Sequence, residues 1–301
     1  MIENANDDAV RDAALFAAMN TGLLPQANTS IFRYVGTRGN AWDFVEKTLL
    51  TDTLPLSRAT TLNDPFDTNP VIVDDVVAAD IFRFAEELLK QQGQVFDLAK
   101  VVDAQGRPVS KQELEEHATA LIYSLFKQRN EACHIASFSR RISSELQWSH
   151  YGDSYKGLAY HFVTRPSEGS GFKHLRPVRY SSQLPVILLS EMMDHINAFQ
   201  SGGGFTLRWL AFEQRCFLTK SLEWAYEEEE RIIKQGGISE ISFLDRELVS
   251  IIVGPRFPEA ELDRLKAILT KRQRPLKLFR AQSSPTSYAV EVDWHNNLFP
   301  A

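Results

Sequence analysis

The stretch W-A-Y-E-E-E-E-R-I-I, residues 224–233, places four consecutive acids between aromatic residues and an Arg-Ile-Ile sequence. The β-branched residues that end it indicate that the segment enters a β-strand. Side chains alternate between the two faces of a strand, so Glu227, Glu229 and Arg231 are expected on one face. Such a set can shift a carboxylate pKa, bind a polar ligand or position a general base. The alternative is a solvated acidic helix end.

The composition is that of a globular protein. The chain has 301 residues, of which 44% are hydrophobic and 24% are charged, enough for one large domain or two small ones. Its net charge of −6 argues against broad binding to a phosphate backbone, although a local basic pocket stays compatible with it. Cys133 and Cys216 are too few for a disulfide framework and are expected as buried thiols.

The termini and apolar runs predict a soluble cytoplasmic protein without membrane association. The first residues, M-I-E-N-A-N-D-D, lack the layout of a signal peptide, and no apolar run reaches membrane-spanning length. Residues 1–30 are expected as an N-terminal helical arm, with a helix over 7–24 that is a candidate contact for a protein partner. Residues 31–301 are expected as one α+β domain with a helical insertion near 76–131.

The order of the elements favours an α+β fold whose helices are partly segregated from a mostly antiparallel, split central sheet. Strands are expected at 31–36, 133–139, 157–162, 175–181 and 248–255, with closing strands near 276–281 and 288–292. Helices are expected at 41–50, 146–153, 184–199, 206–217 and 258–271. The triple glycine at 202–204 follows a helix, which favours a linker over a phosphate-binding loop.

Three polar islands lie far apart along the chain. The first joins Arg33 and Tyr34 to the turn N-D-P-F-D at 63–67, which contains Asn63 and Asp64. The second island comprises Ser137, Ser139, Trp148, His150, Tyr151, Lys156 and Gly157. The third is the acidic segment at 227–231. Each island alone can be explained by packing or by a rigid turn, but together they predict one cleft.

The islands also carry a resemblance that covers roughly residues 31–291. F-R-Y at 32–34, N-D-P-F-D at 63–67, S-F-S at 137–139, W-S-H-Y at 148–151 and W-A-Y-E-E-E-E-R at 224–231 form an ordered signature. This signature resembles that of an uncharacterised bacterial family. Members of that family look like accessory or toxin-like genes of mobile and defence loci.

The order Arg, S-x-S, E-x-E is also similar to the Arg/Ser/Glu pattern of ADP-ribosyltransferases. The resemblance implies that NAD is the substrate, that Arg33 contacts its diphosphate and that Ser137 and Ser139 support the nicotinamide pocket. It also implies that Glu227 and Glu229 form the E-x-E pair, with Glu229 as the catalytic acid. The remaining members of the implied site are Tyr151, Tyr34 and Trp148, as rings beside nicotinamide, with Asn63, Asp64 and Arg231 lining the same cleft.

That chemistry suits the residue types. Cleavage of the nicotinamide–ribose bond develops positive charge on the sugar, which a fixed carboxylate stabilises. The diphosphate requires guanidinium groups, for which Arg33, Arg140 and Arg141 are candidates. The implied function is a toxin-like or defence-associated enzyme that transfers ADP-ribose to a protein or nucleic-acid acceptor.

Several alternatives stay open from the sequence. Phe138 stands where the transferase pattern has Thr, and Glu228 with Glu230 fits E-x-E spacing as well. A metal-dependent nuclease could hold Mg²⁺ through Asp64, Asp67, Glu227 and Glu229. Lys220 and Lys234 are then available as the lysine that a nuclease usually places near its acids. A non-catalytic sensor or scaffold of a defence system would bury the same groups as a polar network. Convergence of the islands on an open cleft favours a site, whereas full pairing of Arg231 in a closed interior favours the scaffold.

Overall fold

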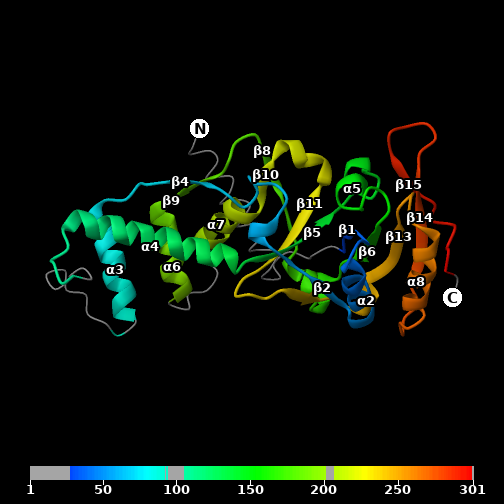
Figure 1. Cartoon of the computed structure of the whole chain (residues 1–301), viewed down its shortest axis with the longest axis horizontal. Coiled ribbons are helices and arrows are strands. Elements are labelled where there is room, and N and C mark those ends of the chain that lie inside the picture. Colours follow the sequence, from blue (N-terminus) through cyan, green and yellow to red (C-terminus); the bar gives the residue numbers. More distant parts are fainter. Residues whose placement is uncertain (1–27, 92, 94–104, 201–206, 300–301) are drawn as a thin grey trace.

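The computed structural model describes residues 28–91, 93, 105–200 and 207–299. The molecule is elongated, with a helical part at one end, a sheet through its centre and a C-terminal helix and strands at the other end (Figure 1). The expected N-terminal helix at 7–24 and the triple glycine at 202–204 lie outside the described residues. None of the helices in the described ranges combines the length and apolarity required to span a membrane.

The central sheet has nine strands. Along the chain these are β1 (Ser30–Val35), β3 (Ser57–Arg58), β5 (His134–Ser139), β6 (Leu158–Val163), β7 (Arg176–Pro177), β11 (Glu229–Lys234), β13 (Leu248–Val253), β14 (Lys277–Ser283) and β15 (Val290–Val292). Their order across the sheet is β15-β14-β13-β6-β1-β5-β11-β7, with β3 on β5. Only the β13–β14 pair is parallel among these neighbours, so the expected α+β class with a mostly antiparallel sheet is confirmed.

Three small two-stranded sheets and seven α-helices complete the described chain. The small sheets pair β2 (Thr53–Pro55) with β12 (Glu240–Ser242), β4 (Val71–Val73) with β9 (Val186–Leu188), and β8 (Arg179–Ser181) with β10 (Thr219–Ser221). The helices are α2 (Ala41–Thr51), α3 (Ala78–Gln91), α4 (Lys111–Glu131), α5 (Glu145–His150), α6 (Leu189–Gln200), α7 (Leu207–Phe217) and α8 (Glu259–Leu269).

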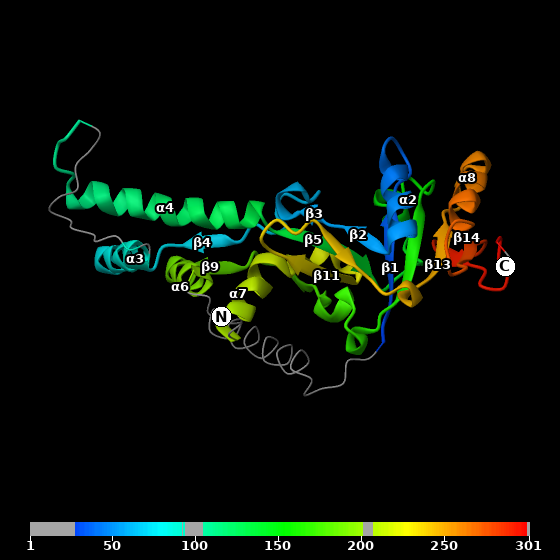
Figure 2. The ribbon, with the colours of Figure 1, turned by 90° about the horizontal axis from the view of Figure 1, so that it is seen from below.

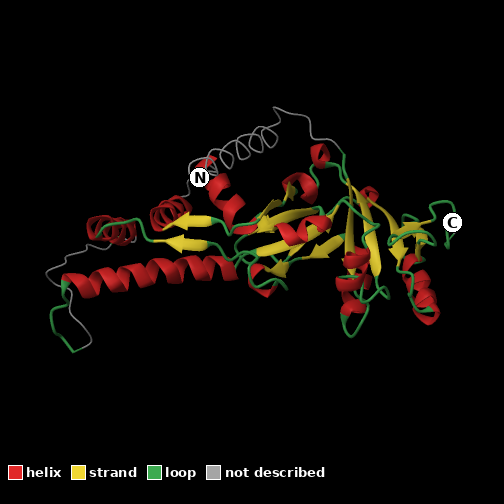
Figure 3. Ribbon diagram, turned by 90° about the horizontal axis from the view of Figure 1, so that it is seen from above, coloured by secondary structure: helices red, strands yellow, loops and turns green. Residues whose placement is uncertain are grey.

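The sheet opens between β1 and β5. Strand β1 pairs with β6 over its whole length, and β11 pairs with β5 over six residues. The two sections are joined by the single pair Phe32↔Ser139. Figure 2 shows β1 and β13 running across the direction of β5 and β11, and Figure 3 shows from the opposite side that the strands fall into groups of different direction. Backbone pairing therefore stops where two differently directed sections meet, and side chains line the gap.

Two hydrophobic clusters fix the ends of the molecule. On the sheet side, α2 and α8 bury Trp42, Leu49 and Leu265 against Tyr160 of β6 and its neighbours. In the helical part, which Figure 2 shows extending away from the sheet, the core is formed by aliphatic, aromatic and methionine side chains. They include Phe84, Phe126, Met192 and Phe212, from α3, α4, α6 and α7 respectively. Helices α3 and α4 lie within residues 76–131, the range of the expected helical insertion, and they pack with α6 and α7 rather than alone.

Three expected elements differ from the structure. The segment 184–199 was expected to be entirely helical, but Val186–Leu188 forms β9 and the helix begins at Leu189, because β4 offers these apolar residues a parallel strand partner. The expected strand at 175–181 is divided into β7 and β8, which join different sheets. The acidic segment begins as a 3₁₀ helix, Leu222–Glu227, and becomes a strand only at Glu229.

Gly157 is required where β6 begins. A Cβ at this position would lie 2.3 Å from the carbonyl oxygen of Val35, an approach that backbone atoms cannot relieve cheaply. We expect Gly157→Ala to lower the free energy of unfolding by about 1–3 kcal/mol, the usual range for overpacking. Urea unfolding measures this change in the free energy of unfolding. Gly36→Ala is the matched control, since its Cβ would meet no atom closer than 3.5 Å, and equal losses in both variants would contradict this explanation.

Candidate functional site

A cavity of about 300 Å³ lies where β1 and β5 part. This is the lower end of the range for small-molecule pockets. Ser57, Thr61 and Asn63 line it and are exposed, so it opens to solvent. Members of all three polar islands line it: Arg33, Tyr34, Asn63, Ser137, Ser139, Tyr151, Glu227, Glu229 and Arg231.

The acidic segment reaches this cavity through a turn. Glu228 adopts a left-handed conformation, with φ of 46°, between the 3₁₀ helix and β11. Its N–H donates to the carbonyl of Ala225, and its own carbonyl accepts from the N–H of Arg140. Glu227 therefore lines the same cavity as Glu229 although it precedes the strand. Glu230 lies on the other face of β11 and pairs with Arg140, so Glu229 and Arg231 share a face as strand alternation predicts, whereas Glu227 reaches the cavity through the turn and not through alternation.

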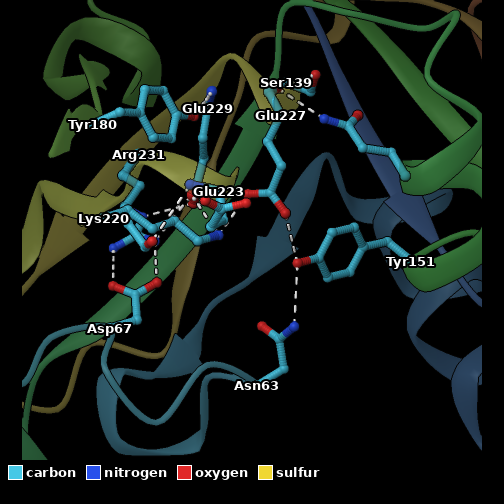
Figure 4. Close-up of polar contacts among 12 residues, drawn as sticks. Asn63, Asp67, Ser139, Tyr151, Tyr180, Lys220, Glu223, Glu227, Glu229 and Arg231 are labelled. Atoms are coloured by element: carbon cyan, nitrogen blue, oxygen red, sulfur yellow. Dashed lines mark hydrogen bonds and ion pairs between the residues drawn. The ribbon is translucent and has the colours of Figure 1, made fainter. Parts of the chain in front are cut away.

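Arg231 is completely buried, and every donor position of its guanidinium is used. Nε donates to Oε1 of Glu229 at 2.6 Å. Nη1 donates to Oδ1 of Asp67 and to the carbonyl of Phe217, both at 2.8 Å. Nη2 donates to Oδ2 of Asp67 at 2.5 Å and to Oε2 of Glu229 at 3.0 Å. The bidentate geometry with Asp67 suits a guanidinium and a carboxylate. Figure 4 shows Arg231 between Asp67 and Glu229.

Glu229 is held as an ionised carboxylate. Besides Arg231, it accepts a hydrogen bond from Nζ of Lys220 at 3.2 Å. Burial alone would raise its pKa, but the charges of Arg231 and Lys220 outweigh burial and lower the pKa to about 2. A hydrogen bond from the Ser137 side chain acts in the same direction. Its backbone is also fixed, since its N–H donates to the phenol oxygen of Tyr180 at 2.8 Å.

Glu227 has a different environment. Its carboxylate accepts from Nζ of Lys220 at 2.5 Å and from the phenol of Tyr151 at 2.8 Å. Burial raises the pKa of Glu227, and the nearby charge of Glu229 raises it further, although Lys220 opposes both. Two neighbouring carboxylates thus have pKa values displaced in opposite directions, a pattern associated with acid–base sites.

The surroundings of Glu227 position it from both sides. Its backbone carbonyl accepts hydrogen bonds from the Ser139 hydroxyl at 2.6 Å and from Nε2 of Gln147 at 2.8 Å. Tyr151, which donates to its carboxylate, accepts in turn from the amide of Asn63 at 3.3 Å. Burial and the charge of Glu227 raise the pKa of the Tyr151 phenol, which keeps its proton in place. Figure 4 shows this chain crossing the cavity from Asn63 to Glu227.

Arg33 is among the residues that line the cavity, but it forms no ion pair with the acids and takes the other face of the sheet. The register Phe32↔Ser139 puts Phe32 on the face of Ser139, so Arg33 takes the opposite face. Its guanidinium lies 5.8 Å from the ring centre of Phe138. Burial lowers the pKa of Arg33 to about 10, and its Nη1 has no hydrogen-bond partner. An unsatisfied buried donor beside a cavity is a position where an anionic group would be stabilised.

Two other predicted residues lie behind the cavity. Trp148 is fully buried, donates from Nε1 to the carbonyl of Ile142, and meets the ring of Tyr34 edge-on at 5.0 Å. Its surface is therefore not free for stacking on a ligand. Asp64 is buried, and its carboxylate accepts from the N–H of Phe66, which fixes the turn. Both side chains support the site rather than line it.

The sequence interpretation did not identify the central role of Lys220. It considered Lys220 only as a lysine near a nuclease site, whereas its ammonium is buried, bridges the two acids and lies 4.6 Å from the ring centre of Trp224. Asp67 was considered only as a metal ligand, and Gln147 was missed. The lysine of T-K-S at 219–221, shortly before the acidic segment, could have indicated an ion pair with one of the acids. Which acids it contacts depends on the pairing of β10 with β8.

The carboxylates do not gather around a common point. Within the described ranges, no group of three or more His, Cys, Asp and Glu side chains could hold a metal ion. The oxygens of Asp67 and Glu229 are instead bonded to Arg231. Comparison of the chain with protein-family models, with curated proteins and with solved structures gave no match.

Loss of the Arg231 fork should be strongly destabilising. Arg231→Lys keeps the charge but cannot serve Asp67 and Glu229 together. We expect the free energy of unfolding to fall by about 3–5 kcal/mol, as when one partner of a buried pair is removed. Lys271→Ala, which breaks an exposed pair with Glu46, should cost about 1 kcal/mol or less. Denaturant unfolding of both variants checks this, and similar small losses would show that Arg231 is not central.

The low pKa of Glu229 predicts a specific pH dependence. A carboxyl whose folded pKa is depressed contributes stability above its unfolded pKa and loses it as pH falls toward the folded value. The advantage of the wild type over Glu229→Gln should therefore be constant near neutral pH and shrink between pH 4.5 and about 2. Urea unfolding across this range measures it, and a difference independent of pH would contradict the assignment.

Proposed function

We propose that this protein is a toxin-like or defence-associated transferase that uses NAD as substrate and moves its ADP-ribose to a macromolecular acceptor. The observation that carries the proposal is the adjacency of β1, β5 and β11 around one solvent-open cavity. These strands bear Arg33, the Ser137–Ser139 pair and Glu229, in the same order as in the ADP-ribosyltransferase pattern. An ADP-ribosyltransferase-like fold and membership of the resembled bacterial family are parts of this proposal.

The bound NAD would extend through the gap between β1 and β5, with its diphosphate and its nicotinamide end on different faces of the sheet. Arg33, whose Nη1 lacks a partner, would meet the diphosphate. The nicotinamide and its ribose would lie toward Ser137, Tyr151 and the acids. A cavity of about 300 Å³ accommodates the nicotinamide ribose portion better than the whole dinucleotide, so the adenosine end would extend out past the exposed rim.

The two acids have different proposed roles. Glu229 is bonded to both Arg231 and Lys220, so much of its charge is already neutralised. Glu227 has one cationic partner and a phenol, which leaves more of its lone pairs for substrate. We therefore assign the catalytic carboxylate to Glu227 and make Glu229 a positioning residue that acts through Lys220 and Arg231. The resemblance in sequence implied Glu229 as the catalytic acid, whereas we assign this role to Glu227.

The proposed reaction conserves atoms and charge. The bond between ribose C1′ and the nicotinamide nitrogen breaks, and nicotinamide leaves as a neutral molecule with the electron pair. The Glu227 carboxylate stabilises the positive charge that develops on the ribose. A nucleophile of the acceptor then bonds to C1′ and releases its proton, for which a carboxylate of raised pKa is a suitable base.

The test is incubation with labelled NAD. We expect the wild type to release nicotinamide and Glu227→Gln to lower the rate by roughly 10²–10³-fold, typical of losing one charge-stabilising group. Tyr151→Phe should lower the rate less, because Lys220 still holds Glu227. Glu223→Gln, which changes an exposed acid of the same segment, is the control and should behave as wild type.

A non-catalytic sensor or scaffold is the second candidate. The observation that favours it is the complete pairing of Arg231, which satisfies every charge at the floor of the cavity without a ligand. The NAD experiment separates the two functions. Absence of nicotinamide release by folded wild type, with NAD binding also absent, would reject the transferase and leave the scaffold.

A further inference from the structure

A second hollow of about 400 Å³ lies at the start of β13 and β14. Its lining includes His161 and Ser250 from the sheet, Phe279, Trp294 and two cationic residues, Arg274 and Lys277. None of these residues lines the first cavity. The hollow thus has a chemistry of its own, aromatic and cationic, that the proposed NAD site does not use.

The two hollows lie on one face of the sheet. Across neighbouring strands Phe32 is paired with His161, His161 with Ser250, and Ser250 with Lys277, and paired residues share a face. The same register pairs Phe32 with Ser139 of the first cavity. Phe32 lines the first cavity, and its ring stacks at 4.7 Å on His161, which lines the second. These two stacked rings form the wall between the hollows.

The cations of the second hollow are not neutralised. The segment K-R-Q-R-P-L-K at 271–277 contains four cations and no acid, in a chain of net charge −6. Lys271 is tied to Glu46, and the guanidinium of Arg272 is shared by two aspartates. Arg274 and Lys277 are exposed, and neither forms an ion pair with any described residue. Two free cations at the mouth of a hollow attract an anion, such as a phosphate group.

Trp294 gives the hollow an open aromatic surface. It is 43% exposed, although it meets Phe279 edge-on at 5.2 Å and His161 at 5.5 Å. Both ring nitrogens of His161 are occupied by hydroxyls, those of Ser30 and Ser250. Burial lowers the pKa of His161 to about 4, so it is a neutral wall at physiological pH and adds no third charge. Exposed aromatic rings of this kind stack on nucleobases.

We propose that this second hollow binds a nucleotide unit, with its base against Trp294 and its phosphate between Arg274 and Lys277. The acceptor of the transfer is then a single-stranded nucleic acid that crosses the Phe32–His161 wall, with the adjoining nucleotide at the first cavity. The acceptor assignment rests on the proposed function, whereas binding at the second hollow does not. Because the chain as a whole has a net charge of −6, we expect contact with the nucleic-acid backbone to be limited to this short basic segment.

Binding is tested without NAD, by fluorescence anisotropy of a short labelled single-stranded DNA and RNA and by calorimetry with AMP. We expect Trp294→Ala to weaken binding of the labelled strand about tenfold or more, as for loss of one stacked base. Arg274→Ala and Lys277→Ala should each weaken it and reduce the slope of log affinity against log salt by about 0.7. Tyr288→Ala, at a ring that is 98% exposed elsewhere, and Lys271→Ala are the controls and should bind as wild type.

The outcomes separate this inference from the proposed function. Strand binding that depends on Trp294 and Arg274 supports the inference whether or not NAD is cleaved. No binding of strand or AMP overturns it, as does binding that the Trp294 and Lys277 variants retain. Binding of AMP alone overturns the nucleic-acid acceptor. Cleavage of NAD with transfer only to protein also overturns that acceptor and leaves the transferase intact. Failure of NAD cleavage with intact strand binding overturns the transferase and the acceptor assignment that rests on it, and leaves nucleotide binding at the second hollow.

Discussion

The buried fork of Arg231 is the interaction on which the site depends. It joins Asp67 of the loop after β3, the end of α7 through the carbonyl of Phe217, and Glu229 of its own strand. Asp67 and Arg231 are 164 residues apart in the chain. Because these groups are buried, removal of the guanidinium would leave Asp67 without its counter-ion and Glu229 with Lys220 alone. The fork therefore holds one side of the cavity and sets the position of both acids.

The second constraint is the gap in the sheet. Continuous pairing of β1 with β5 would bring their backbones together and leave no room between them for a ligand. A single pair at Phe32 lets the β1–β6–β13 section turn away, so that side chains of both sections face one space. The second hollow adjoins this space, since Phe32 lines the first cavity and its ring stacks on His161, which lines the second hollow.

Within that space, Glu227 and Glu229 have different numbers of cationic partners. Lys220 bridges the acids, but Glu229 has a second cation in Arg231, whereas Glu227 has a phenol. The pKa values of the two carboxyls are consequently displaced in opposite directions by neighbours rather than by their own chemistry. Glu229 is therefore suited to fix the structure, and Glu227 to exchange a proton or to stabilise a developing positive charge.

The sequence by itself determined the local features of the protein. Alternation in the acidic segment predicted that Glu229 shares a face with Arg231, and apolar periodicity predicted helices within residues 76–131, because both depend on near neighbours. Tertiary structure decided the rest. Lys220 became the bridge through the β8–β10 pair, Val186–Leu188 became a strand because β4 lies beside it, and Trp148 was enclosed by packing. Those outcomes depend on partners distant in the chain, and a pattern of neighbouring residues contains no information about such partners.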